Sequence, residues 1–151
     1  MVTEFWDIIG ENTLRTEADV DAALARVSAR LAPLPTYDLL NFVDGLHEAL
    51  FRLDRRQFAE IPVFVRDLVI PQSEDGFQYA RCACVLAGRR VFEEVLATGE
   101  GFEPFTVPEL QSERLLYLAG EHYEAKMGFP MEHRRTFPID MMSNPDGWDS
   151  H

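Results

Sequence analysis

The chain has little of what several common classes of protein require. Its 151 residues include only two cysteines and one lysine among the 14 basic residues. No apolar run reaches the roughly 18 residues that a membrane-spanning helix needs, and the acidic N-terminus MVTEFWDIIGEN lacks the basic region of a signal peptide. Two cysteines are too few for a disulfide framework. These absences predict a cytoplasmic protein without a membrane span.

Positive charge is also scarce. The 26 acidic and 14 basic residues give a net charge of −12 at pH 7. Because phosphates and anionic lipids attract basic surfaces, we expect neither nucleic acid nor membrane as a partner. Arginine supplies all the basic residues except Lys126. We attribute this excess of arginine to a GC-rich bacterial genome rather than to phosphate recognition.

The remaining composition is that of one ordinary globular domain. Apolar residues make up 46% of the chain, and this length can bury a core without disulfides or metals. Cys82 and Cys84 stand two apart on a predicted helix, so their side chains point to different faces. We therefore expect two buried core thiols and no cofactor.

Apolar residues recur at helical spacing through most of the chain, which predicts an all-α, single-domain bundle of five to six helices. Capping residues mark the expected starts at Thr3, Thr16, Ser73 and Thr106. We expect helices over residues 3–9, 17–31, 36–53, 57–70, 73–98 and 106–128. The central one, 73–98, is the longest, and Gly88 within it suggests that another helix approaches closely.

Two segments are less regular. Residues 57–70 are β-branched and could form a strand. We favour a helix because the apolar spacing is helical and Pro62 would sit in the first turn, where its missing N–H matters little. Residues 129–151 show no periodicity but carry many apolar residues. We expect this irregular tail to pack on the helical domain of residues 1–128 or on a partner subunit.

The central segment also carries a family resemblance. The run from Ser73 to Tyr79, with Arg81, Gly88-Arg89 and Val91-Phe92-Glu93, resembles the bacterial domain of unknown function 4240 family. Further matching blocks occur in the same order as in the family, and the resemblance covers roughly residues 3–128. These further blocks are Glu4-Phe5-Trp6, Leu115-Leu116-Tyr117 and Tyr123-Glu124-Ala125-Lys126.

The resemblance implies a soluble bacterial protein and brings no activity, cofactor or catalytic residue. The chain departs from the family pattern at Ile70-Pro71-Gln72 and at Ala80 and Cys84, where the family tends to have Gly-Gly-Cys and aromatic residues. Any site lined by those aromatic residues in other members is altered here.

Few residues suggest chemistry. His47-Glu48 begins like the zinc motif HExxH, but Phe51 stands where the second histidine should be. Asp44 and His47 share a helix face and could form an interhelical metal site with His122. The simpler interpretation is a polar fringe on two helices. We find no GxSxG elbow and no phosphate-binding glycine loop.

Asp75, Tyr79 and Arg81 are the strongest candidates for ligand binding. Asp75 and Tyr79 stand one helical turn apart, and Arg81 falls near the apolar face, where a guanidinium needs a partner. The simpler interpretation is structural, with Arg81 paired to an Asp or Glu from another helix. The alternative is a site for a small anionic molecule or a peptide.

The sequence therefore favours a non-enzymatic interaction or regulatory module. Its partner could be a protein, such as a basic toxin in an immunity pair, or a second copy joined through the tail. The alternative is a small-molecule or metal-binding protein, possibly an enzyme, with its site between helices. Acidic mimicry of nucleic acid ranks last, because the acidic residues are spread over both halves of the chain.

Overall fold

The structure is a computed structural model that describes residues 4–132 and 136–149. Five of its helices have seven or more residues, which confirms the all-α, single-domain prediction. The elements are α1 (Phe5–Ile9), α2 (Glu17–Leu31), α3 (Thr36–Arg52), α4 (Arg56–Ala59), β1 (Val63–Val65), β2 (Leu68–Ile70), α5 (Glu74–Ala87), α6 (Arg89–Thr98), the 3₁₀ turns η1 (Glu103–Thr106), η2 (Pro108–Leu110) and η3 (Glu113–Leu116), α7 (Leu118–Met127) and α8 (Pro145–Trp148).

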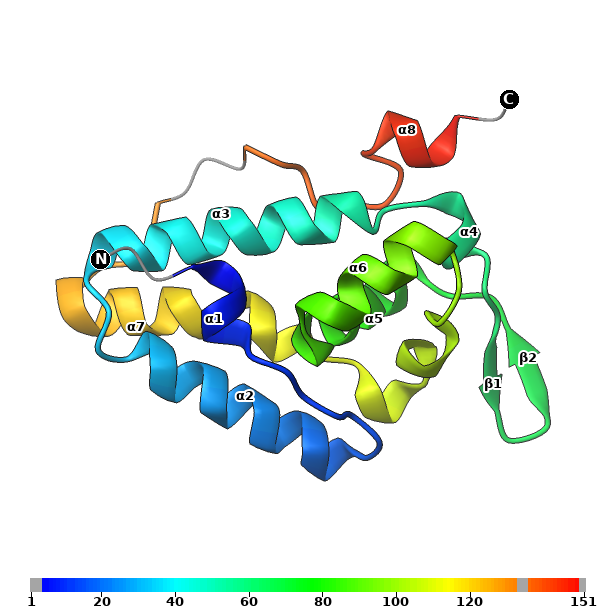
Figure 1. Cartoon of the computed structure of the whole chain (residues 1–151), viewed down its shortest axis with the longest axis horizontal. Helices are drawn as coiled ribbons and strands as arrows, with labels where there is room; N and C mark the ends of the chain where they lie inside the picture. The colour runs from blue at the N-terminus through cyan, green and yellow to red at the C-terminus, as the bar shows by residue number, and fades with distance from the viewer. Residues whose placement is uncertain (1–3, 133–135, 150–151) are drawn as a thin grey trace.

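Helix α5 is the centre of the fold. Every residue from Ala80 to Ala87 is buried, together with Phe77, because α3, α6, η1 and η3 all pack around it. Helices α3 and α7 lie side by side, and β1 and β2 form a hairpin that projects from one end of the molecule (Figure 1). Among the described residues, no helix combines the length and apolar character needed to cross a membrane.

Two of the predicted helix starts are confirmed. Thr16 and Asp19 form a reciprocal capping box, in which each side chain accepts the other's backbone N–H (3.2 and 3.1 Å). Ser73 caps α5, since its Oγ accepts the N–H of Gly76 (2.9 Å). Thr3, the predicted cap of the first helix, lies outside the described residues.

The prediction of one helix over 73–98 is wrong, because the chain breaks at Gly88. Gly88 has φ 116° and ψ 172°, a backbone conformation that is essentially restricted to glycine. A Cβ at this position would lie 2.7 Å from the carbonyl oxygen of Gly10. The close approach expected at Gly88 therefore comes from the loop after α1, not from another helix.

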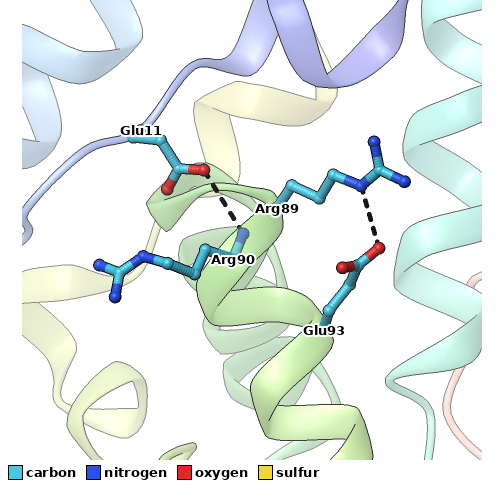
Figure 2. A network of polar contacts seen from close by, with 4 residues as sticks. All are labelled: Glu11, Arg89, Arg90 and Glu93. Atoms are coloured by element: carbon cyan, nitrogen blue, oxygen red, sulfur yellow. Dashed lines mark hydrogen bonds and ion pairs between the residues drawn. The ribbon is translucent and has the colours of Figure 1, made fainter.

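This loop caps both helices at the break. The backbone N–H of Asn12 donates to the Ala87 carbonyl (3.1 Å), and its Nδ2 donates to the Leu86 carbonyl (2.7 Å). Both are terminal carbonyls of α5 that lack intrahelical donors. At the start of α6, the N–H of Arg90 donates to the Glu11 carboxylate (3.4 Å; Figure 2). A long-range contact therefore ends one helix and starts the next.

The helix predicted over 57–70 is also wrong. Only Arg56–Ala59 is helical, and Val63–Val65 pairs antiparallel with Leu68–Ile70. Arg66, with φ 57°, provides the left-handed residue of the two-residue turn between these strands. Here β-branched propensity outweighs the helical spacing, because the segment leaves the body and has no helix-packing face to fill.

The last predicted helix begins later than expected. Thr106 does not form a capping box but donates from its hydroxyl to the Glu103 carbonyl (2.8 Å), and α7 starts only at Leu118. Three 3₁₀ turns precede it and bury Phe105, Leu110 and Leu115 in the core. In a continuous helix the buried residues of this stretch would spread over more than half of its circumference, so short turns place them better. These residues are Thr106, Leu110, Ser112, Leu115 and Leu118.

The two thiols make stability sensitive to alkaline pH. Burial raises the pKa of Cys82 and Cys84 to about 12, above the ordinary value of 9.0. Between these two pH values the unfolded chain loses thiol protons that the folded chain retains. The stability that the protonated thiols contribute is therefore complete below pH 9 and is lost as pH rises toward 12. The free energy of unfolding falls by up to about 1.4 kcal/mol per pH unit for each thiol.

Urea unfolding at a series of pH values between 8 and 11 measures this effect. The double variant Cys82→Ala/Cys84→Ala should lose stability less steeply with pH than the wild type. Equal slopes for the two proteins would show that the thiols do not titrate as their burial requires.

Candidate interaction surface

Arg81 is fully buried and takes a structural role. Its Nη1 donates to the Leu50 carbonyl at the end of α3 (3.0 Å), and its Nη2 donates to the Ile139 carbonyl in the tail (2.9 Å). The guanidinium also lies 4.5 Å from the ring centroid of Phe77. The expected carboxylate partner is absent from the ion pairs of the described residues. Burial lowers the pKa of Arg81, and the negative charge of Asp54 opposes that shift.

Asp54 anchors the tail to the body. This carboxylate is fully buried just after α3. Its Oδ1 accepts the backbone N–H of Met142 (3.1 Å) and the indole N–H of Trp148 (2.8 Å). Its Oδ2 accepts the N–H groups of Ser143 (2.7 Å) and Asn144 (3.0 Å). Four donors replace the water that a buried carboxylate loses.

Apolar contacts complete the docking of the tail. Ile139 is buried in the core, Phe137 packs on Phe51 with ring centroids 5.6 Å apart, and the Arg56 guanidinium lies 5.8 Å from the Trp148 ring centroid. The described part of the tail passes the C-terminal end of α3 and leads into α8, which lies beside α4 (Figure 1). The described part of the tail therefore packs on the helical body of the same chain.

Asp75 and Tyr79 lie on the surface, separate from Arg81. They face η3, where Glu113 accepts a hydrogen bond from the Tyr117 hydroxyl (3.1 Å). Partial desolvation and then the negative charges of Asp75 and Glu113 raise the pKa of Tyr79. The proposed ligand set is therefore divided, because Arg81 contacts α3 and the tail while Asp75 and Tyr79 belong to an acidic surface.

The structure does not assemble the proposed metal set. Asp44 is exposed on α3 and His47 is buried. His122 shares a hydrogen bond between its Nε2 and the Ser28 hydroxyl (2.9 Å). Over residues 4–132 and 136–149, no three His, Cys, Asp or Glu side chains are grouped to hold a metal ion.

An acidic groove of about 470 Å³ runs between α2 and the η2–η3 segment. Four carboxylates line it, from Glu17, Asp21, Glu109 and Glu113. The groove also holds Arg114, whose Nη1 lies 4.0 Å from the Asp21 carboxylate. Both partners of this pair are mostly exposed, so it offsets little of the negative charge.

The hairpin is the most unusual surface of the molecule, because all six of its strand residues are apolar. Its register pairs Val63 with Ile70, Phe64 with Val69 and Val65 with Leu68. Facing residues share one side of an antiparallel pair, so both sides of the hairpin are apolar. An antiparallel sheet with a face in water normally alternates apolar and polar residues.

Four of these six side chains are open to solvent, while Val63 and Val65 are half-buried. Phe64 is 66% exposed, Leu68 64%, Val69 62% and Ile70 41%. In the part of the chain that the structure describes, no third strand pairs with either edge. The helix predicted over residues 57–70 hid this exposed hairpin from the sequence analysis. The signal was present, because two short β-branched runs separated by Arg66-Asp67 are typical of a hairpin.

Fold and surface together define a small helical domain with a docked tail and a projecting apolar hairpin. The chain belongs to the DUF4240 family, described as a protein of unknown function, whose family model matches residues 1–125. The match stops before the tail, so the four donors that bind Asp54 lie beyond it. No curated protein and no solved structure matches the chain.

Proposed function

We propose that this protein is a non-enzymatic interaction module that binds a protein partner through the hairpin. The observation that carries the proposal is the exposure of large apolar side chains on both sides of a projecting two-stranded sheet. Contiguous exposed apolar surface of this kind is typical of interaction sites. An isolated two-stranded hairpin is only marginally stable in water, so a partner would also stabilise its conformation.

The environments of Arg81, Cys82 and Cys84 favour structural roles over catalytic ones, which fits a non-enzymatic protein. Arg81 binds two backbone carbonyls, and Cys82 and Cys84 are buried thiols whose pKa lies far above neutral. A buried thiol with a raised pKa is a poor nucleophile. Two reduced thiols also fit a bacterial cytoplasm, which is where we place the module.

Site-specific photo-cross-linking in cells of the native host tests the proposal. With p-benzoylphenylalanine in place of Phe64, we expect a discrete protein adduct. The matched control places the same group at Tyr37, which is 67% exposed and lies at the start of α3, at the opposite end of the molecule from the hairpin (Figure 1). No adduct at position 64, or the same adducts at both positions, would contradict the proposal.

A hairpin variant gives the matching affinity measurement. Phe64→Ser/Val69→Ser should weaken binding to the cross-linked partner by about 100-fold or more, because two apolar anchors are lost. Since both residues are exposed, unfolding free energy should change by no more than about 1 kcal/mol. Tyr37→Ser should leave binding unchanged. Calorimetric titration measures the affinity, and urea unfolding confirms that the variants remain folded.

A further inference from the structure

We infer that the partner is a basic protein, which takes the apolar hairpin into a groove and lays a positively charged surface on the acidic residues beside it. This inference rests on the proposed function and specifies the chemistry of the partner. Three features support it: the small size of the hairpin, the charge of the surface that continues from it, and the net charge of the chain.

The hairpin alone is too small for a complete interface. A standard interface buries about 800 Å² on each partner, and two strands of three residues supply only a fraction of that area. A partner that covers the hairpin must therefore cover neighbouring surface as well. The charge of that neighbouring surface then decides which partners fit.

The base of the hairpin is acidic on the side of α5. Glu60, Glu74 and Asp75 are exposed next to the strands, whereas the turn itself holds one arginine and one aspartate, Arg66 and Asp67. Two of the acidic residues, Glu74 and Asp75, stand in the first turn of α5, which begins four residues after β2 ends. A partner that reaches down the hairpin therefore meets negative charge.

The negative charge continues from α5 to the groove. We name as the acidic face the carboxylates of Asp75, Glu113, Glu109, Asp21 and Glu17. Helix α5 packs on η3, and the N–H of Ser112, the neighbour of Glu113, donates to the carbonyl of Tyr79 (3.2 Å), one turn along α5 from Asp75. Glu113 in turn lines the groove with the other three members. Arg114 is the basic residue among the groove's lining side chains, and it is exposed.

Charge also argues against a second copy as the partner. Each chain carries a net charge of −12, and a two-fold symmetric contact places the same patch of both subunits together. Two acidic faces would then oppose each other within the screening length of about 8 Å at physiological salt. A basic surface on a different partner would instead be attracted to the acidic face, and this attraction accelerates association.

The experiment begins with the adduct formed at position 64 and identifies its protein by mass spectrometry. We expect a protein with an isoelectric point above about 9. The purified partner is then titrated against the full chain between 50 and 300 mM NaCl. Affinity should fall as salt increases, mostly through a slower association rate.

Charge variants separate this inference from the proposed function. Asp75→Asn/Glu109→Gln/Glu113→Gln should weaken binding by about 10-fold or more at 150 mM NaCl. The control Glu48→Gln/Glu94→Gln/Glu124→Gln removes the same charge from exposed positions on α3, α6 and α7 and should weaken binding by less than about threefold.

Each outcome is decisive. A basic partner whose binding depends on the acidic face supports the inference. Equal effects of the two charge variants, an adduct with a neutral or acidic protein, or an adduct with a second copy would overturn the inference and leave the hairpin as the binding element. Failure of the Phe64→Ser/Val69→Ser variant to weaken binding would overturn the proposed function as well.

Discussion

Replacing Gly88 with alanine should lower the free energy of unfolding by at least about 3 kcal/mol. At φ 116° and ψ 172° an alanine is strained, because its Cβ crowds its own backbone. The Cβ would also lie 2.7 Å from the Gly10 carbonyl and would clash with the Glu11 carboxylate. The Glu11 side chain can rotate away, but the carbonyl belongs to the loop that caps α5.

The Gly88→Ala variant can relieve this strain by one of two rearrangements, and each of them loses native contacts. If the loop after α1 moves away, Asn12 loses its bonds to the last carbonyls of α5. If α5 and α6 join into one helix, α6 leaves the position in which Phe92 and Val95 are buried. Urea unfolding followed by far-ultraviolet circular dichroism measures the loss of stability.

Gly120 provides the matched control. It lies within α7, and a Cβ there would have no atom within 4 Å. Gly120→Ala should therefore stabilise the protein by about 0.4–1 kcal/mol through helix propensity and a less flexible unfolded chain. Similar stabilities for Gly88→Ala and Gly120→Ala would show that the break between α5 and α6 does not require glycine.

Replacing Asp54 with asparagine should release the tail and lower the free energy of unfolding by about 2–4 kcal/mol. Each carboxylate oxygen of Asp54 accepts two hydrogen bonds. In asparagine one oxygen becomes an NH₂ group, which would point its own hydrogens at two donors. The tail then either keeps unpaired buried groups or leaves the body and exposes Ile139 to water.

Hydrogen exchange reports this change directly. The amides of Met142, Ser143 and Asn144 should lose their protection in Asp54→Asn, and limited proteolysis should cut the tail sooner. Asp44→Asn, an exposed change on the preceding helix, should alter neither property. Unchanged protection in Asp54→Asn would mean that apolar contacts alone hold the tail.

Helix starts with local caps were predictable from the sequence. The Thr16–Asp19 capping box and the Ser73 cap each involve residues three apart, so short-range sequence contains all of the partners. Helix α3 was predictable for a similar reason, because its apolar residues cover most of the helix surface. In both cases local hydrogen bonding and periodicity agree with the tertiary environment.

The errors share one physical cause, which is that the deciding partner lies far along the chain. The central helix ends before Gly88 because Asn12 caps it from 74 and 75 residues earlier in the chain. Arg81 donates to carbonyls 31 and 58 residues away. In the sequence, Asp54 resembles any polar residue at the end of a helix, but the groups that donate hydrogen bonds to its carboxylate lie 88–94 residues later. Three of those donors are backbone N–H groups, which leave no signature in the side chains.

The sequence by itself determined the helical class, the acidic character, the buried thiols and the family, because composition, local caps and short blocks of residues carry that information. Tertiary structure alone decided that Arg81 and Asp54 hold the tail, that Asp75 lies on an acidic face apart from Arg81, and that an apolar hairpin stands in solvent. Burial and charge environment depend on which distant segments meet. The surface that we propose for binding is therefore defined only in the folded chain.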